Sequence, residues 1–126
     1  MKHIIKTSNA PAPIGPYSQA VLYNGLLFTS GQIAIDPNSG ELDNSDIGIE
    51  TIRVMENLKA VLAEANMTFE NVLKSTIFIS DMNHFAAINE IYEAYFSNEN
   101  APARETVEVA RLPKDVNIEI SMIAAK

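Results

Sequence analysis

Apolar residues along this chain alternate over short runs near its start, which predicts extended structure. The pattern favours a short strand at residues 3–6 and two longer strands at residues 18–23 and 26–33. Asn24 and Gly25 separate the two longer runs, and this dipeptide favours the positive φ angles of a tight hairpin turn. The segment before them, residues 7–18, contains three prolines and a glycine. We therefore expect an irregular loop followed by a β-hairpin.

Two later stretches have the spacing of amphipathic helices. The first begins near Ile47, after Ser45 or Asp46 as a capping residue, and closes at Asn66, a residue that tolerates the left-handed conformation. Its apolar stripe consists of Ile52, Met55, Leu58, Leu62 and Ala65. The stripe of the second helix consists of Phe85, Ile88, Ile91, Tyr92, Tyr95 and Phe96, and we assign it to the core.

The remaining apolar runs predict three more strands. Residues 72–80 include Ile77, Phe78 and Ile79, which are apolar on both faces, so we expect a central strand covered on each side. Residues 105–111 and 116–124 follow, joined by a turn at 112–115. The order β-β-β-α-β-α-β-β predicts an α+β fold, with one mixed sheet of about six strands and two helices on one face. The other face then needs a partner.

The last two strands suggest a hairpin with a definite register. A four-residue turn at 112–115 would place Val109 opposite Ile118 and Val107 opposite Ile120, so that apolar residues face each other. Side-chain alternation would then put five polar residues on one face: Arg104, Thr106, Glu108, Glu119 and Ser121. The backbones of Arg104 and Glu119 would lie about 13 Å apart, and their long side chains would span a small acid and a water molecule.

Composition and charge narrow the functional classes. The 126 residues, of which 47% are hydrophobic, fit a single domain over residues 1–126. A net charge of −7 opposes binding to nucleic acid, which relies on clustered Lys and Arg. There is no cysteine, and no apolar run approaches membrane-spanning length. His3 and His84 have no companions at ligand spacing. We expect a cytoplasmic protein without a metal or other cofactor and without a membrane.

Six motifs in the same order resemble the reactive intermediate deaminase A (RidA) family, and the resemblance covers nearly the whole chain. They are GPYSQAV (15–21), FTSGQI (28–33), NEIY (89–92), APAR (101–104), VEVARLPKD (107–115) and IEI (118–120). The resemblance implies a chorismate-mutase-like fold and a homotrimer with a site at each subunit interface. It also implies hydrolysis of reactive 2-imino acids, such as those derived from 2-aminoacrylate, to 2-keto acids and ammonia.

The same resemblance assigns roles to individual residues. Arg104 would hold the substrate carboxylate, and Glu119 would hold or activate the water. The residues implied to line the site are Tyr17, Ser30, Gly31, Asn89 and Thr106. After the arginine the family often has a small pair such as Ser-Cys, where this chain has Glu105 and Thr106. Strand alternation should turn Glu105 to the opposite face.

Each of these residues also has a structural alternative. Arg104 suits a surface ion pair, and Glu119 suits the solvent face of an amphipathic strand. Tyr17 suits packing of the proline-rich loop, Ser30 and Gly31 a bend in a strand, and Asn89 a contact between a helix and a loop. Two other functional classes stay open: a non-catalytic trimer that senses small keto acids, and a chaperone- or ribonuclease-like protein.

Overall fold

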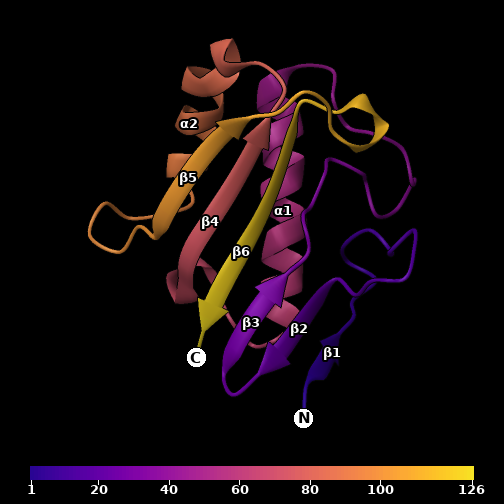
Figure 1. Cartoon of the computed structure of the whole chain (residues 1–126), viewed down its shortest axis with the longest axis vertical. Helices are drawn as coiled ribbons and strands as arrows, with labels where there is room; N and C mark the ends of the chain where they lie inside the picture. Colours follow the sequence, from indigo (N-terminus) through magenta and orange to yellow (C-terminus); the bar gives the residue numbers. More distant parts are fainter.

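The computed structural model describes all residues from Met1 to Lys126 and shows one six-stranded mixed sheet with two helices. The order of strands across the sheet is β1-β2-β3-β6-β4-β5 (Figure 1). The strands are β1 (His3–Ile5), β2 (Ala20–Tyr23), β3 (Leu26–Thr29), β4 (Val72–Ile79), β5 (Ala103–Glu108) and β6 (Ile118–Ala125). The predicted order of elements and the α+β class are thereby confirmed.

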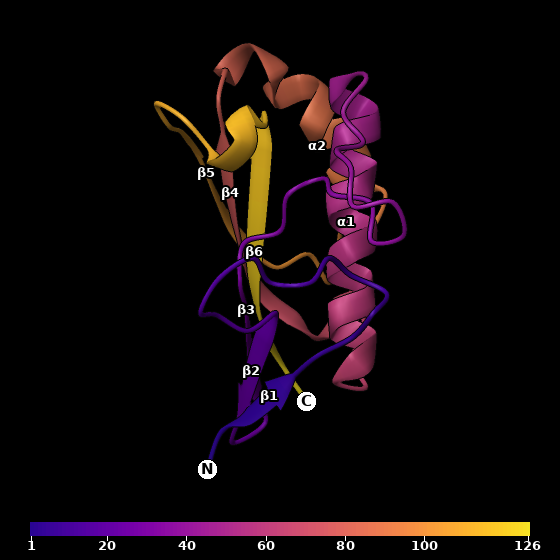
Figure 2. The ribbon, with the colours of Figure 1, turned by 90° about the vertical axis from the view of Figure 1, so that its right-hand side faces the viewer.

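Both helices lie on one face of the sheet, as predicted (Figure 2). Helix α1 (Ile47–Glu64) begins after Asp46, whose side chain accepts a hydrogen bond from the Ile49 N–H at 2.8 Å. Asn66 follows its end with a φ of 59°. Helix α2 (Phe85–Glu93) ends three residues before the predicted Phe96. Neither helix has the length and apolar character that crossing a membrane requires.

The first hairpin forms where the dipeptide predicted it. Asn24 and Gly25 have φ angles of 50° and 78°, and Tyr23 pairs with Leu26 across the turn. Strand β3 ends at Thr29, four residues before the predicted end at residue 33. Beyond it the chain stays beside β6 through an isolated bridge between Gln32 and Ile120.

The predicted hairpin of the last two strands is wrong, because β4 lies between β5 and β6. Strand β5 pairs in parallel with β4, and β6 pairs antiparallel with both β4 and β3. Helix α2 connects β4 to β5, and such a crossover lays the second strand parallel to the first. The apolar residues that suggested the hairpin register, Ile118 and Ile120, instead pair with Ile79 and Ile77 of β4.

The predicted common face for Arg104 and Glu119 is wrong for the same reason. Arg104 is level with Ser75 of β4, whereas Glu119 is level with Phe78. Ser75 and Phe78 are three positions apart, so they point to opposite faces. Arg104 therefore lies on the helix-covered face and Glu119 on the open one. Of the other residues grouped with them, Thr106 and Glu108 share the face of Arg104, and Ser121 that of Glu119.

The core fills the space between the sheet and the helices, and the opposite face of the sheet is uncovered within one chain. Core residues such as Leu58, Ile77 and Ile120 are at most 1% exposed. On the open face, Phe28 is 44% and Val107 is 42% exposed. Apolar surface of this kind commonly marks an interaction site. The predicted partner for this face stays a prediction.

Candidate active site in two halves

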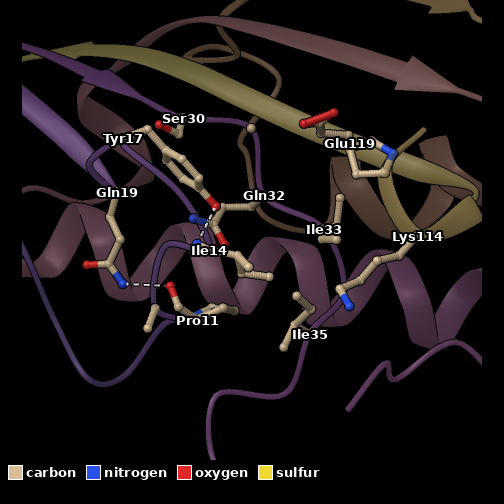
Figure 3. Close-up of a pocket in the computed structure, with 13 residues that line it drawn as sticks. Pro11, Ile14, Tyr17, Gln19, Ser30, Gln32, Ile33, Ile35, Lys114 and Glu119 are labelled. Carbon is tan, nitrogen blue, oxygen red and sulfur yellow. Dashed lines mark hydrogen bonds between the residues drawn. The ribbon is translucent and has the colours of Figure 1, made fainter. Parts of the chain in front are cut away.

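A cavity of about 470 Å³ lies between the proline-rich loop, the segment after β3 and the start of β6 (Figure 3). It brings together four of the predicted site residues, which come from segments far apart in the sequence: Tyr17, Ser30, Gly31 and Glu119. Apolar residues form much of the remaining wall, among them Pro11, Ile14, Ile33 and Ile35. Lys114 lines the same cavity. We call this cavity the Glu119 half-site.

Gln19 holds the proline-rich loop in place beside this half-site. Its side-chain nitrogen donates to the carbonyl oxygens of Thr7 (2.9 Å), Ala10 (3.2 Å) and Pro11 (2.9 Å), and its oxygen accepts from the Thr7 N–H (2.7 Å). Gln19 is only 2% exposed, so these bonds are shielded from water. A segment without regular secondary structure is thereby fixed as a wall of the cavity.

Glu119 is the acidic group of this half-site. Its side chain is half-buried, and no hydrogen bond to its carboxylate forms within the chain. Burial raises the pKa of the Glu119 carboxyl above its ordinary value, because removal from water disfavours the charged form. The next residue, Ile120, exchanges two backbone hydrogen bonds with Gln32, at 2.8 and 3.2 Å. The Glu119 carboxylate therefore lies at the cavity wall next to a backbone that is held in place by the bonds to Gln32.

The second half contains Arg104 and lies on the other face of the sheet. The Nη1 of Arg104 donates to the Asn89 Oδ1 at 2.6 Å, and the guanidinium lies 5.1 Å from the ring centre of Tyr92 and 5.6 Å from that of Phe85. Arg104 forms no ion pair within the chain, so the surface ion pair considered from sequence is absent in the isolated chain. Its remaining N–H groups are free to bind an anion.

Arg104 and Asn89 line a second cavity of about 350 Å³, which we call the Arg104 half-site. Thr106 lines neither cavity, but its hydroxyl oxygen is buried without a hydrogen-bond partner on the same face as Arg104. Glu105 turns to the other face, as predicted, and pairs with Lys74 at 2.8 Å. The carboxylate next to Arg104 in sequence is therefore directed away from the guanidinium.

Sequence reasoning missed several residues that shape the two half-sites. Phe85 and Tyr92 belong to the stripe that was assigned to the core, and Tyr92 is indeed 5% exposed, yet both also support the guanidinium. Gln19 lies inside the GPYSQAV motif, but nothing in the sequence indicates its side-chain hydrogen bonds to the loop. Lys114 lies in the turn before β6. The backbone of this turn, with a φ of 57° at Lys114, brings the residue to the cavity wall.

Comparison with known proteins gives a consistent assignment. The family model for endoribonuclease L-PSP matches residues 7–126. A RutC family protein of Synechocystis is 53% identical over 122 residues, covering 96% of this chain and 94% of the relative. The 2-iminobutanoate/2-iminopropanoate deaminase of Escherichia coli is 45% identical over 128 residues, covering 100% of this chain and 99% of the relative.

A solved structure shares the fold as well. The crystal structure of Escherichia coli TdcF with bound serine has a TM-score of 0.93 and 44% sequence identity, with 98% of each chain covered. The resemblance inferred from the six motifs is confirmed by these matches. The fold predicted from that resemblance is confirmed by the shared architecture.

Proposed function

This chain belongs to the endoribonuclease L-PSP family, and from that membership and the two half-sites we propose that it hydrolyses 2-imino acids to 2-keto acids and ammonia. The substrates would be small, such as 2-iminopropanoate and 2-iminobutanoate, which form from the reactive enamines of amino-acid metabolism. The activity would remove these reactive species. The main support for the proposal comes from two charged groups that each line a cavity. They are the Arg104 guanidinium, which has no ion-pair partner, and the half-buried Glu119 carboxylate.

Arg104 would bind the substrate carboxylate. A guanidinium presents two parallel N–H groups that match the two oxygens of a carboxylate, and charge-assisted bonds of this kind are strong and directional. The bond to Asn89 and the rings of Phe85 and Tyr92 hold the guanidinium plane while leaving donors available. The bound serine of TdcF also carries a carboxylate, which agrees with a site for small acids.

Glu119 would act on the water. A protonated imine carbon is already a strong electrophile, so an oriented water needs only a base to add to it. Glu119 would take the proton as the C–O bond forms, giving a carbinolamine, and return it to the nitrogen. As the C–N bond breaks and ammonia leaves, the carbinolamine hydroxyl would give its proton to the Glu119 carboxylate, which is free again at this point, and the keto acid remains. A backbone carbonyl near Thr106 would hold the imine N–H.

The two halves would come from neighbouring subunits. Within one chain Arg104 and Glu119 lie on opposite faces of the sheet, so one substrate cannot bridge them there. The open face has exposed apolar residues, including Ile4, Phe28 and Val107, that association would bury. A homotrimer with three sites between subunits, as the family resemblance implies, would satisfy both requirements.

The direct experiment generates the imines and follows their loss. A pyridoxal-phosphate-dependent dehydratase acting on serine or threonine releases 2-aminoacrylate or its four-carbon homologue, and semicarbazide traps the imine that has not yet been hydrolysed. The protein should lower semicarbazone formation while the release of keto acid and ammonia speeds up. A protein that binds keto acids but leaves the imine lifetime unchanged would be a sensor, which is the main alternative.

A ribonuclease-like function is the second alternative, because the family name contains that activity. The net charge of −7 disfavours the contacts to phosphate on which RNA binding depends. Incubation of the same preparation with RNA tests this alternative directly, and we expect no cleavage.

A further inference from the structure

Glu50 is a carboxylate that the proposed reaction does not use, and it is buried in an unusual way. It lies on α1 and is 0% exposed, yet it forms no ion pair. Its Oε2 accepts a hydrogen bond from the backbone N–H of Asn117, and its Oε1 accepts one from the Asn117 side-chain nitrogen, both at 2.8 Å. Burying a carboxylate is costly unless hydrogen bonds satisfy it. Glu50 therefore depends on Asn117.

Asn117 is in turn bonded to Ser80, the residue that directly follows β4. Its side-chain oxygen accepts from the Ser80 hydroxyl at 3.2 Å, and its backbone carbonyl accepts from the Ser80 N–H at 3.0 Å. Asn117 immediately precedes β6 and lies two residues before Glu119. Glu50 and Ser80 thus hold the chain on one side of Glu119, and the Gln32 bridge to Ile120 holds it on the other.

We propose that Glu50 is a positioning residue for Glu119, which it serves by fixing the backbone at Asn117. The inference rests on the proposed function, in which Glu119 must face a water and a substrate supplied partly by another subunit. Small displacements of a catalytic group lower rates steeply, by as much as about 10²-fold for 1 Å. A rigid start to β6 is therefore useful for catalysis as well as for stability.

The role requires a hydrogen-bond acceptor rather than a negative charge. In a Glu50→Gln variant the amide oxygen still accepts from the Asn117 N–H. If the side-chain amide of Asn117 rotates by half a turn, the Asn117 oxygen accepts a hydrogen bond from the side-chain nitrogen of the introduced Gln. The Asn117 nitrogen then donates to the Ser80 hydroxyl, so every polar group keeps a partner. A Glu50→Leu variant is similar in size but leaves the Asn117 N–H without an acceptor.

The test compares these two variants with Glu56→Leu as a matched control. Glu56 is also on α1, but its carboxylate accepts a hydrogen bond from the Tyr95 hydroxyl at 2.8 Å and forms none with Asn117. We expect Glu50→Gln and Glu56→Leu to keep wild-type kcat, and Glu50→Leu to lose about tenfold or more. The dissociation constant of a 2-keto acid should change little, because Arg104 binds the carboxylate.

A second measurement does not depend on activity. Carbon-13 NMR of the Glu119 carboxyl should show a pKa that is unchanged in Glu50→Gln but falls toward the ordinary glutamate value in Glu50→Leu, as the side chain becomes more exposed. If Glu50→Leu does not fold, Asn117→Ala takes its place, and we expect the same decrease in kcat and the same decrease in the Glu119 pKa. A folded variant with wild-type kcat and an unmoved Glu119 titration would overturn the inference. An inactive wild-type protein would overturn the proposed function instead, since the titration would still report on Glu50.

Discussion

The side chain of Glu119 occupies the space where any residue other than glycine at position 31 would place its Cβ. A Cβ built on Gly31 would lie 2.6 Å from the Glu119 carboxyl carbon and 2.8 Å from its Cγ. Both distances are far shorter than a van der Waals contact between carbon atoms. Gly31 is needed here for this close approach, since its φ is not in the left-handed region.

The variant Gly31→Ala should therefore fold and yet lose activity. The group that must move is a flexible side chain rather than backbone, so the cost to stability is small, but the carboxylate leaves its position above the strand. We expect kcat for 2-iminopropanoate to fall by about tenfold or more, with a near-native melting temperature. Gly15→Ala is the control, because its Cβ would meet the Tyr17 ring at an ordinary 3.8 Å. Equal activity of the two variants would contradict this account.

Replacement of Glu119 by Gln should remove the base without changing the shape of the site. We expect turnover to fall by about 10² or more, typical of losing a general base, while a 2-keto acid still binds. In the wild-type protein, kcat/KM should rise with pH as Glu119 ionises, with a midpoint above the ordinary glutamate pKa because burial raises it. A parallel loss of binding and turnover would indicate a structural carboxylate instead.

The same substitution should stabilise the protein at neutral pH. The folded-state pKa of Glu119 is raised, so the folded state holds its proton more tightly than the unfolded state does. The free energy of unfolding of the wild-type protein therefore decreases as the pH rises from the unfolded-state pKa of Glu119 to its folded-state pKa. At higher pH the free energy of unfolding stays lower by this full amount. Glu119→Gln does not ionise, so its melting temperature should exceed that of wild type at pH 7. The difference should shrink below the unfolded pKa, and calorimetry at several pH values measures it.

The accuracy of the sequence predictions depended on how local each signal was. The Asp46 cap and the Asn24-Gly25 turn are set by neighbouring residues, and both appear where predicted. The pairing of β6 is not local, since its apolar residues match those of β4 as well as those of β5. In the structure β6 lies between β3 and β4, and the registers of β5 and β6 against β4 put Arg104 on the face opposite Glu119. The motifs provided the candidate site residues, and strand pairing determines which of them lie in the same half-site.

Arg104 should be required for substrate binding as well as for turnover. Arg104→Ala removes the anchor for the carboxylate, and we expect kcat/KM for 2-iminopropanoate to fall by about 10²-fold. Arg104→Lys should recover little, because an ammonium cannot form two parallel bonds to a carboxylate. Arg53→Ala is the control, since Arg53 pairs with Asp43 at 3.4 Å elsewhere on the chain. Near wild-type turnover by Arg104→Ala would disprove the anchor role.

Mixing two inactive variants tests whether each site is shared between subunits. If Arg104 and Glu119 of one site come from different chains, an oligomer assembled from Arg104→Ala and Glu119→Gln chains contains some sites with both residues intact. Random assembly at equal amounts should restore about a quarter of wild-type activity, because each residue is intact with a probability of about one half. Light scattering should give about three times the 13.8 kDa chain mass. If both residues of a site came from the same chain, the mixture would be as inactive as either variant alone, and the opposite faces that they occupy in the sheet would need another explanation.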